Sequence, residues 1–236
     1  MEFKYSLRIA HLYGDLMNTY GDYGNVLILQ YYGRKMDVKV TSKVVSLDES
    51  FKASDYDLAV FGGGQDFEQS IVSKDLQTKK KELTKFINSG APIIAVCGGY
   101  QMLGKYYVDA AGQKMPGIGA MNHYTKQQHH HRFIGNIEIE NPHTHRKYHG
   151  FENHQGITFL GKGERPLGKV IKGHGNNGQD GTEGARYKNT YCTYFHGPTL
   201  ARNPILAKDM LIEALERKYP HANLSKQKAL QIKPSY

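Results

Sequence analysis

The stretch APIIAVCGGYQMLG, residues 91–104, decides the fold. Residues 93–96 form a short apolar run of the kind that makes a buried strand, and the periodicity of residues 100–107 predicts a helix. Cys97 lies where the strand must turn sharply into that helix, and the two glycines after it keep the turn free of side chains. Such a turn projects a nucleophile from a sheet edge and leaves the Gly98 N–H free to bond an oxyanion. We therefore expect Cys97 to be a reactive thiol.

On both sides of this turn, short apolar runs alternate with segments of helical period, as in an α/β fold. After residue 117 the helical period gives way to short strand signals. We predict a three-layer α/β fold with a central, mostly parallel sheet and an antiparallel extension, and an active site at the carboxyl ends of the strands. The expected strands are 6–13, 37–45, 56–61, 93–96, 133–140, 156–160, 169–172 and 185–195, and the other expected helices are 26–33, 73–89 and 204–218.

The length of 236 residues suits a single domain, which we place at residues 1–220, followed by a polar tail, residues 221–236, lying loosely on the surface. No run approaches the roughly 18 uncharged apolar residues of a membrane span, and residues 1–12 carry charges where a signal peptide would be apolar. These features predict a cytoplasmic protein without membrane insertion. Two cysteines are also too few to staple a chain of this length in an oxidising compartment.

The net charge is +9, from 31 Lys and Arg against 22 Asp and Glu, which favours encounter with an acidic partner. The basic residues are scattered along the chain, and no nucleic-acid-binding motif interleaves them with aromatic residues. We therefore expect no nucleic-acid binding. A nucleic-acid-binding module would instead show steep loss of binding with added salt.

The two cysteines occupy different sequence contexts. Cys192 lies in YCTYF, an alternating strand pattern with bulky neighbours and no glycine, which is typical of an inert buried cysteine. A reactive thiol needs a base, and imidazole has a suitable pKa. Among twelve histidines, His196 ends a predicted strand and precedes Gly197 and Pro198, so its ring is expected at a sheet edge like Cys97. This argument alone does not separate His196 from the other histidines.

Three ordered motifs carry a family resemblance: FGGGQDFEQ at 61–69, AVCGGYQMLG at 95–104 and FHGPTLARNP at 195–204. Together they resemble the class I glutamine amidotransferase domain, in its cobyric-acid-synthase-like branch. HLYGDLMNTYGDYGN, residues 11–25, is similar to the glutaminase subunits of lipid II isoglutaminyl synthases. The likeness covers about residues 7–215, nearly the whole chain.

The resemblance implies that Cys97 attacks the side-chain amide of L-glutamine, forming a thioester and releasing ammonia, with His196 as base and then acid. It implies an oxyanion hole made by the Gly98 N–H and one N–H from Gly63 or Gly64. Gln101 matches a position that contacts substrate.

An arginine fork can hold the α-carboxylate of glutamine bidentately, and the resemblance points to Arg132. Arg186 and Arg202 are the rival candidates. Class I members commonly place an acid two residues after the histidine, where this chain has Pro198. A backbone carbonyl, an acid from elsewhere in the chain or an acid from a partner subunit could orient His196 instead. We hypothesise that turnover by this chain alone is weak and rises with the partner.

The resemblance also implies a partner, a Mur-ligase-like synthetase subunit that forms a heterodimer and uses the ammonia to amidate D-glutamate of the lipid II stem peptide in peptidoglycan synthesis. The chain has no phosphate-cradling G-x-x-x-x-G-K-[ST] loop, so ATP and Mg²⁺ are expected on the partner and no cofactor on this chain. Lipid II would bring the complex to the inner membrane face. The alternatives are a different acceptor such as cobyrinate, a cysteine peptidase, and a non-catalytic partner-binding protein.

Histidines cluster at His129, His130 and His131, and again at His143, His145, His149 and His154. The spacing does not fit structural zinc sites, which use C-x-x-C pairs or histidines one helical turn apart. We therefore expect no metal site. One of the first three histidines could line the substrate pocket, because they precede Arg132.

Overall fold

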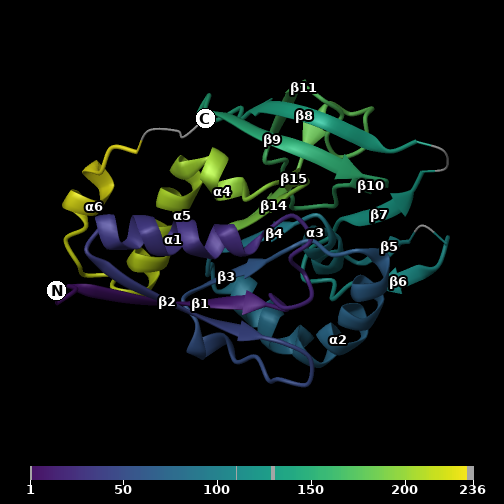
Figure 1. Ribbon diagram of the computed structural model, residues 1–236. Coiled ribbons are helices and arrows are strands. Elements are labelled where there is room, and N and C mark those ends of the chain that lie inside the picture. The colour runs from purple at the N-terminus through teal and green to yellow at the C-terminus, as the bar shows by residue number, and fades with distance from the viewer. Residues whose placement is uncertain (1, 110, 129–130, 233–236) are drawn as a thin grey trace.

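A computed structural model describes residues 2–109, 111–128 and 131–232 (Figure 1). Its central sheet has the strand order β13-β14-β4-β3-β1-β2, and every neighbouring pair is parallel except β13 with β14. The strands of this sheet are β1 (Tyr5–Leu12), β2 (Val38–Val45), β3 (Leu58–Phe61), β4 (Ile93–Val96), β13 (Ala185–Tyr187) and β14 (Thr190–Thr193).

Helices cover both faces of this sheet, which makes three layers (Figure 1). Side chains alternate along β3, so Leu58 and Val60 pack against α1 and α5, whereas Ala59 and Phe61 pack against α2. The three-layer α/β prediction is confirmed. The helices are α1 (Tyr23–Lys35), α2 (Asp66–Asn88), α3 (Gly98–Leu103), α4 (Thr199–Arg202), α5 (Pro204–Lys218) and α6 (Ser225–Ala229), with a 3-10 turn, η1 (Ala53–Asp55).

Two smaller, mainly antiparallel sheets extend the fold at the carboxyl ends of the central strands (Figure 1). One has the order β10-β7-β5-β6 and the other β12-β11-β8-β9-β15. The antiparallel extension is therefore also present. Its strands are β5 (Tyr106–Val108), β6 (Lys114–Pro116), β7 (Tyr124–Gln127), β8 (Phe133–Glu140), β9 (Lys147–His154), β10 (Gly156–Phe159), β11 (Gly168–Lys172), β12 (Thr182–Glu183) and β15 (Phe195–His196).

Several predicted boundaries were wrong. The helix expected at 73–89 begins at Asp66, and the helix expected at 100–107 ends at Leu103, after which the chain enters strand β5. The strand expected at 185–195 is three strands in two different sheets. Strand β9 was not predicted, because its alternate buried positions include Glu152 and His154, so the strand carries no apolar alternation.

The expectation of a loose tail was wrong for its first part. Leu224 and Gln227 are buried, and Gln227 Nε2 donates to the Met36 carbonyl at 3.1 Å. Helix α6 therefore packs against the end of α1, and the domain boundary at residue 220 stays a prediction. In the part of the chain that the structure describes, no helix combines the length and apolar character that crossing a membrane requires.

Candidate active site

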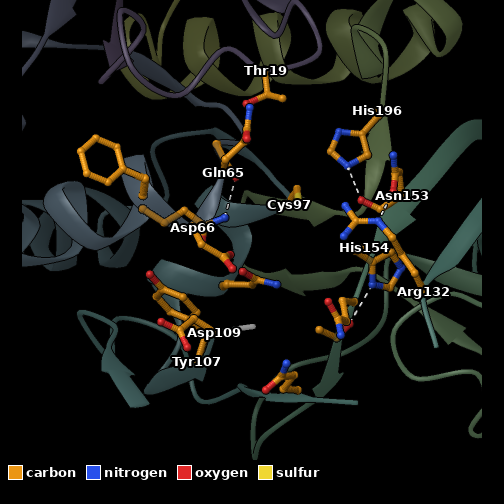
Figure 2. A pocket seen from close by; sticks show the side chains of 18 of the residues that line it. Thr19, Gln65, Asp66, Cys97, Tyr107, Asp109, Arg132, Asn153, His154 and His196 are labelled. Atoms are coloured by element: carbon orange, nitrogen blue, oxygen red, sulfur yellow. Dashed lines mark hydrogen bonds between the residues drawn. The ribbon is translucent and has the colours of Figure 1, made fainter. Parts of the chain in front are cut away.

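A cavity of about 510 Å³ opens beside the carboxyl ends of β3 and β4 (Figure 2). All the predicted site residues except Gly98 line it, although they come from segments far apart in the sequence. In the view of Figure 2, His196, Asn153 and Arg132 lie to one side of Cys97, and Asp66, Asp109 and Tyr107 lie to the other. The fold thus gathers the predicted residues at one place, with the cationic and acidic groups at opposite ends. The predicted site residues on the cavity wall are Gly63, Gly64, Cys97, Gln101, Arg132 and His196.

Cys97 occupies the sharp turn that the sequence predicts. Its φ of 50° and ψ of −106° lie where side-chain-bearing residues are strained, and its N–H is held by the Thr193 carbonyl at 2.9 Å. A side chain on Gly99 could not fit, because its Cβ would lie 2.6 Å from the Phe61 carbonyl oxygen. Packing against β3 and β14 therefore maintains a strained backbone that directs the sulfur into the cavity.

The thiol of Cys97 is neutral in this environment. Burial raises its pKa to about 12, and the negative charge of Asp22 acts in the same direction. The Gly98 N–H and the charge of Arg132 oppose this rise. The groups that favour a thiolate are therefore already beside the sulfur, but burial outweighs them.

His196 shares the space around Cys97. A Cβ built on Gly63 would lie 3.2 Å from the Cβ of Cys97 and 3.6 Å from Cε1 of His196, so both side chains border one small volume. His196 Nε2 lies 3.3 Å from the Asn153 carbonyl oxygen and can donate to it. Nδ1 is buried and has no hydrogen-bond partner among the described residues. His196 could be oriented by a backbone carbonyl, by an acid of this chain or by an acid of a partner, and the structure contains the contact with a backbone carbonyl.

The His196 imidazole is also neutral. Burial lowers its pKa to about 4, with smaller contributions from His154 and Arg132 and an opposing one from the Asn153 carbonyl. The ring of Tyr20 covers it at a centroid distance of 4.1 Å. A neutral imidazole can accept a proton from a thiol, which is the form that base catalysis requires.

The N–H groups of Gly63 and Gly64, both at the cavity wall, differ in their hydrogen bonding. The Gly63 N–H donates to Asp22 Oδ2 at 2.9 Å, whereas the Gly64 N–H has no acceptor in the described part of the chain. The Gly64 carbonyl accepts from Gln69 Nε2 at 2.7 Å, which holds the loop. Of the two candidates for the second oxyanion donor, the Gly63 N–H is already hydrogen-bonded to Asp22, so Gly64 is the one whose N–H is available.

Asp22 is a fully buried carboxyl group beside this loop. Burial raises its pKa to about 6, and the hydrogen bond from Gly63 opposes that rise. Its Oδ1 is buried without a hydrogen-bond partner in the described residues. The sequence analysis did not identify Asp22, since an acid in a glycine-rich loop gives no signal of burial.

Of the three arginines considered, only Arg132 lines the cavity among the described residues. Its Nε donates to Asn153 Oδ1. The Arg186 guanidinium lies 3.4 Å from the centroid of the Tyr191 ring, and Arg202 lines a separate cavity beside Lys172. The geometry therefore favours Arg132.

Gln101 is buried at the cavity wall rather than exposed on the surface. Its Nε2 donates to the Tyr194 hydroxyl at 3.2 Å, and that hydroxyl lies 2.6 Å from Thr158 Oγ1. This network fixes the Gln101 amide.

The structure adds site residues that the sequence analysis missed. Tyr20, Asn153 and His154 line the cavity beside the predicted groups. His154 Nδ1 donates to the Gly156 carbonyl at 2.7 Å, and its ring stacks on Tyr194 with centroids 3.6 Å apart. The sequence GFENHQG, residues 150–156, contains these polar groups, but they become recognisable only when strand β9 is placed next to β15.

Where the structure describes them, the histidines of the two clusters form no recognisable metal centre. His129 and His130 lie outside the described residues, and His131 is exposed. No group of three or more His, Cys, Asp or Glu side chains with a metal-binding arrangement occurs within the described ranges. The absence of a metal stays a prediction.

Comparisons with known proteins identify the family and its relatives. Residues 8–204 match the model of the CobB/CobQ-like glutamine amidotransferase domain. The chain is 51% identical over 217 residues, covering 92% of it and 84% of the relative, to the Streptococcus pneumoniae protein "Lipid II isoglutaminyl synthase (glutamine-hydrolyzing) subunit GatD". It is 38% identical over 214 residues to the Staphylococcus aureus protein of the same name, covering 91% of this chain and 86% of that protein.

A solved structure described as a glutamine amidotransferase is similar with a TM-score of 0.56. That similarity covers 87% of this chain and 98% of the solved one, at 16% sequence identity. At this identity the likeness shows the fold alone.

Proposed function

Because the chain belongs to the CobB/CobQ-like glutamine amidotransferase family, we propose that it is the glutaminase subunit of a lipid II isoglutaminyl synthase. The observation that carries the proposal is the single cavity bordered by Cys97, His196 and Arg132. A thiol, a base and a cation in one pocket are what hydrolysis of a free amino-acid amide requires.

In this proposal the substrate lies between Arg132 and Cys97. The Arg132 guanidinium binds the α-carboxylate of glutamine, and the side-chain amide reaches the sulfur. Gln101 contacts the substrate from the cavity wall, where its amide is held by Tyr194. A ligand bound at both ends presents its carbonyl carbon to the thiol in a fixed orientation.

The first chemical step makes a thioester. His196 accepts the proton of Cys97 as the sulfur attacks the amide carbon, and the carbonyl oxygen becomes an oxyanion. The N–H groups of Gly98 and Gly64 stabilise that oxyanion. His196 then delivers the proton to the amide nitrogen, the C–N bond breaks, and ammonia leaves.

The second step releases glutamate. Water attacks the thioester carbon, His196 accepts a proton from the water, and the same two N–H groups stabilise the second oxyanion. The C–S bond breaks and His196 returns the proton to the sulfur. Each cycle consumes one glutamine and one water and produces one glutamate and one ammonia.

The resting electrostatics favour slow turnover by the isolated chain. With a thiol pKa of about 12 and an imidazole pKa of about 4, the thiol and imidazole are both neutral, and forming the thiolate–imidazolium pair costs free energy. The Asn153 carbonyl, which accepts from His196 Nε2, favours the imidazolium, but burial of the ring outweighs that contact. We infer that binding of the synthetase subunit raises glutaminase turnover.

The synthetase partner is the less direct part of the proposal. The name of the relatives, which describes a subunit of a glutamine-hydrolysing synthase, supports a heterodimer. We propose a Mur-ligase-like partner that binds ATP and Mg²⁺ and amidates D-glutamate of lipid II with the ammonia, while this chain needs no cofactor of its own. Lipid II would hold the complex at the inner membrane face.

The test is co-purification with the candidate synthetase subunit, followed by assays of glutamate release with and without it. We expect weak release by the chain alone, a rise on adding the partner, and ATP-dependent amidation of lipid II. Equal release with and without the partner would remove the activation hypothesis. Amidation of cobyrinate in place of lipid II would replace the proposed acceptor, and cleavage of peptides without glutamine hydrolysis would favour a peptidase.

A further inference from the structure

Asn153 contacts both halves of the site at once (Figure 2). Its backbone carbonyl faces His196 Nε2 at 3.3 Å, and its side-chain Oδ1 accepts a hydrogen bond from Arg132 Nε. One residue thus joins the imidazole that moves protons to the arginine proposed to bind substrate.

Sheet topology explains why Asn153 holds this place. Strand β9, which carries Asn153, lies between β8 and β15. Arg132 immediately precedes β8, where Ile134 pairs with Asn153, and His196 ends β15. Residues 132 and 134 point to the same face, so the Arg132 and Asn153 side chains meet across the strands.

A third hydrogen bond determines the orientation of the Asn153 amide. Arginine Nε can only donate, so Oδ1 must face Arg132 and Nδ2 must face the other way. Nδ2 donates to the Tyr20 hydroxyl, and the Tyr20 ring covers His196. The amide therefore has a defined partner at each end, and Tyr20 contacts both the amide and the base.

This arrangement leaves the guanidinium suited to its substrate. With Nε bonded to Asn153, the edge that carries the two Nη groups remains for a carboxylate, which prefers a bidentate fork. Without the Oδ1 acceptor, the exposed arginine could rotate about its long side chain and would lose entropy on binding.

We propose that Asn153 is a positioning residue that fixes the substrate-binding arginine relative to the His196 imidazole, with Tyr20 holding the Asn153 amide in place. This inference rests on the proposed glutaminase function. It assigns to Asn153 a part in binding the α-carboxylate of glutamine, whereas its carbonyl contact with His196 comes from the backbone and survives side-chain substitution.

Two thiol reagents separate carboxylate recognition from thiol reactivity. The diazoketone analogue of glutamine, 6-diazo-5-oxo-L-norleucine, carries the α-carboxylate, whereas iodoacetamide does not. For Asn153→Ala we expect labelling of Cys97 by the analogue to slow about tenfold, as for loss of one hydrogen bond to a charged group. Iodoacetamide labelling should stay within about twofold of the wild type. In steady-state assays with the partner, KM for glutamine should rise about tenfold while kcat changes less than about threefold.

Tyr20→Phe is the second variant, since it removes the hydroxyl but keeps the ring on His196. We expect analogue labelling to slow about threefold, and we expect no further loss when Tyr20→Phe is added to Asn153→Ala, because both act through one amide. Asn136→Ala is the matched control. Asn136 is an exposed asparagine on neighbouring β8 that lines a different cavity, and its loss should change neither rate.

The proposal would be overturned if the analogue labels Cys97 of Asn153→Ala at the wild-type rate, or if the two rate losses add in the double variant. If circular dichroism shows Asn153→Ala to be unfolded, Tyr20→Phe decides, and a wild-type rate would again overturn it. Failure of the glutaminase function itself looks different, because the analogue would then not label Cys97 of the wild-type chain that iodoacetamide labels.

Discussion

Cys97 and Cys192 lie close together on neighbouring chain segments of the central sheet, but their surroundings differ. Cys192 is on β14 and pairs in register with Ala95 of β4. Cys97 lies two residues after Ala95, directly beyond the end of β4. Cys192 is fully buried and packs 3.6 Å from the sulfur of Met121, whereas Cys97 has a positive φ and borders the cavity.

If Cys97 is the nucleophile, as we propose, its place at a strand end, and not the ionisation of the free thiol, separates it from the structural Cys192. Burial raises the thiol pKa of both. Only Cys97 has an imidazole sharing its space and a Gly98 N–H directed at its sulfur, within the part of the chain that the structure describes. Neighbouring groups therefore decide the chemistry after burial has made both thiols neutral.

Removal of each sulfur in turn has the largest expected effect on the difference between the two cysteines. Cys97→Ser should reduce glutamate release by the partnered enzyme on the order of 10³-fold or more, because a hydroxyl is a much weaker nucleophile beside this base. Cys192→Ser should retain release per folded molecule within about twofold. Glutamate production at saturating glutamine is the measurement, and a comparable loss in both variants would contradict the assignment.

The pH dependence of alkylation tests the neutral thiol. The thiolate is the reactive form, and burial disfavours it, so a pKa of about 12 means that its fraction grows about tenfold per pH unit from pH 7 to 10. Iodoacetamide labelling of Cys97, followed by mass spectrometry, should rise without a plateau in that range, while Cys192 stays unlabelled. A plateau near pH 9 would mean that Gly98 and Arg132 outweigh burial.

Gly63→Ala tests the shared space around Cys97 while leaving both proposed reacting side chains unsubstituted. The added methyl group would lie 3.2 Å from Cys97 Cβ and 3.6 Å from His196 Cε1, a tight but tolerable contact. We expect glutamate release to fall about 10- to 100-fold, because small displacements of reacting groups are costly, while the free energy of unfolding changes by less than about 1 kcal/mol. Unchanged release in a folded variant would show that this space is not used.

The smallest expected effect is on the free energy of unfolding, where glycine substitutions at the two cysteines should act in opposite directions. Cys97→Gly should raise the free energy of unfolding by about 1 kcal/mol, because glycine relieves the strained φ of 50°. Cys192→Gly should lower it by about 2 kcal/mol or more through a buried cavity and a flexible strand. Urea denaturation measures both, and the same sign in both variants would argue against strain at Cys97.

The sequence predicted the parts of the site that depend on local order. Cys97 follows a buried strand and precedes glycines, and the His196 motif ends another strand, so both could be located from short motifs. Asn153, Tyr20 and Asp22 could not, because their roles depend on contacts with residues 21 to 133 positions away. No local pattern encodes such contacts.

The errors in the fold have the same origin. Helix α2 begins seven residues before its predicted start, because its first turn presents Phe67 with 72% of its surface exposed, which disrupts the amphipathic pattern. Strand β9 lacks an alternation of apolar and polar residues because its inward-facing residues include Glu152. The Glu152 carboxylate accepts hydrogen bonds from the backbone N–H groups of His174 and Gly175. A polar side chain whose hydrogen-bond partners are backbone groups far away in the sequence cannot be recognised as buried from the sequence alone.

The path of the chain from β14 to β15 has a mechanical consequence. β14 belongs to the central sheet beside β4, and two residues later β15 belongs to the antiparallel sheet beside β9. Cys97 therefore follows a strand of the central sheet, whereas His196 ends a strand of the antiparallel sheet, and Tyr194 connects the two sheets. If His196 accepts the Cys97 proton, as we propose, the distance over which that proton moves depends on how the two sheets pack against each other.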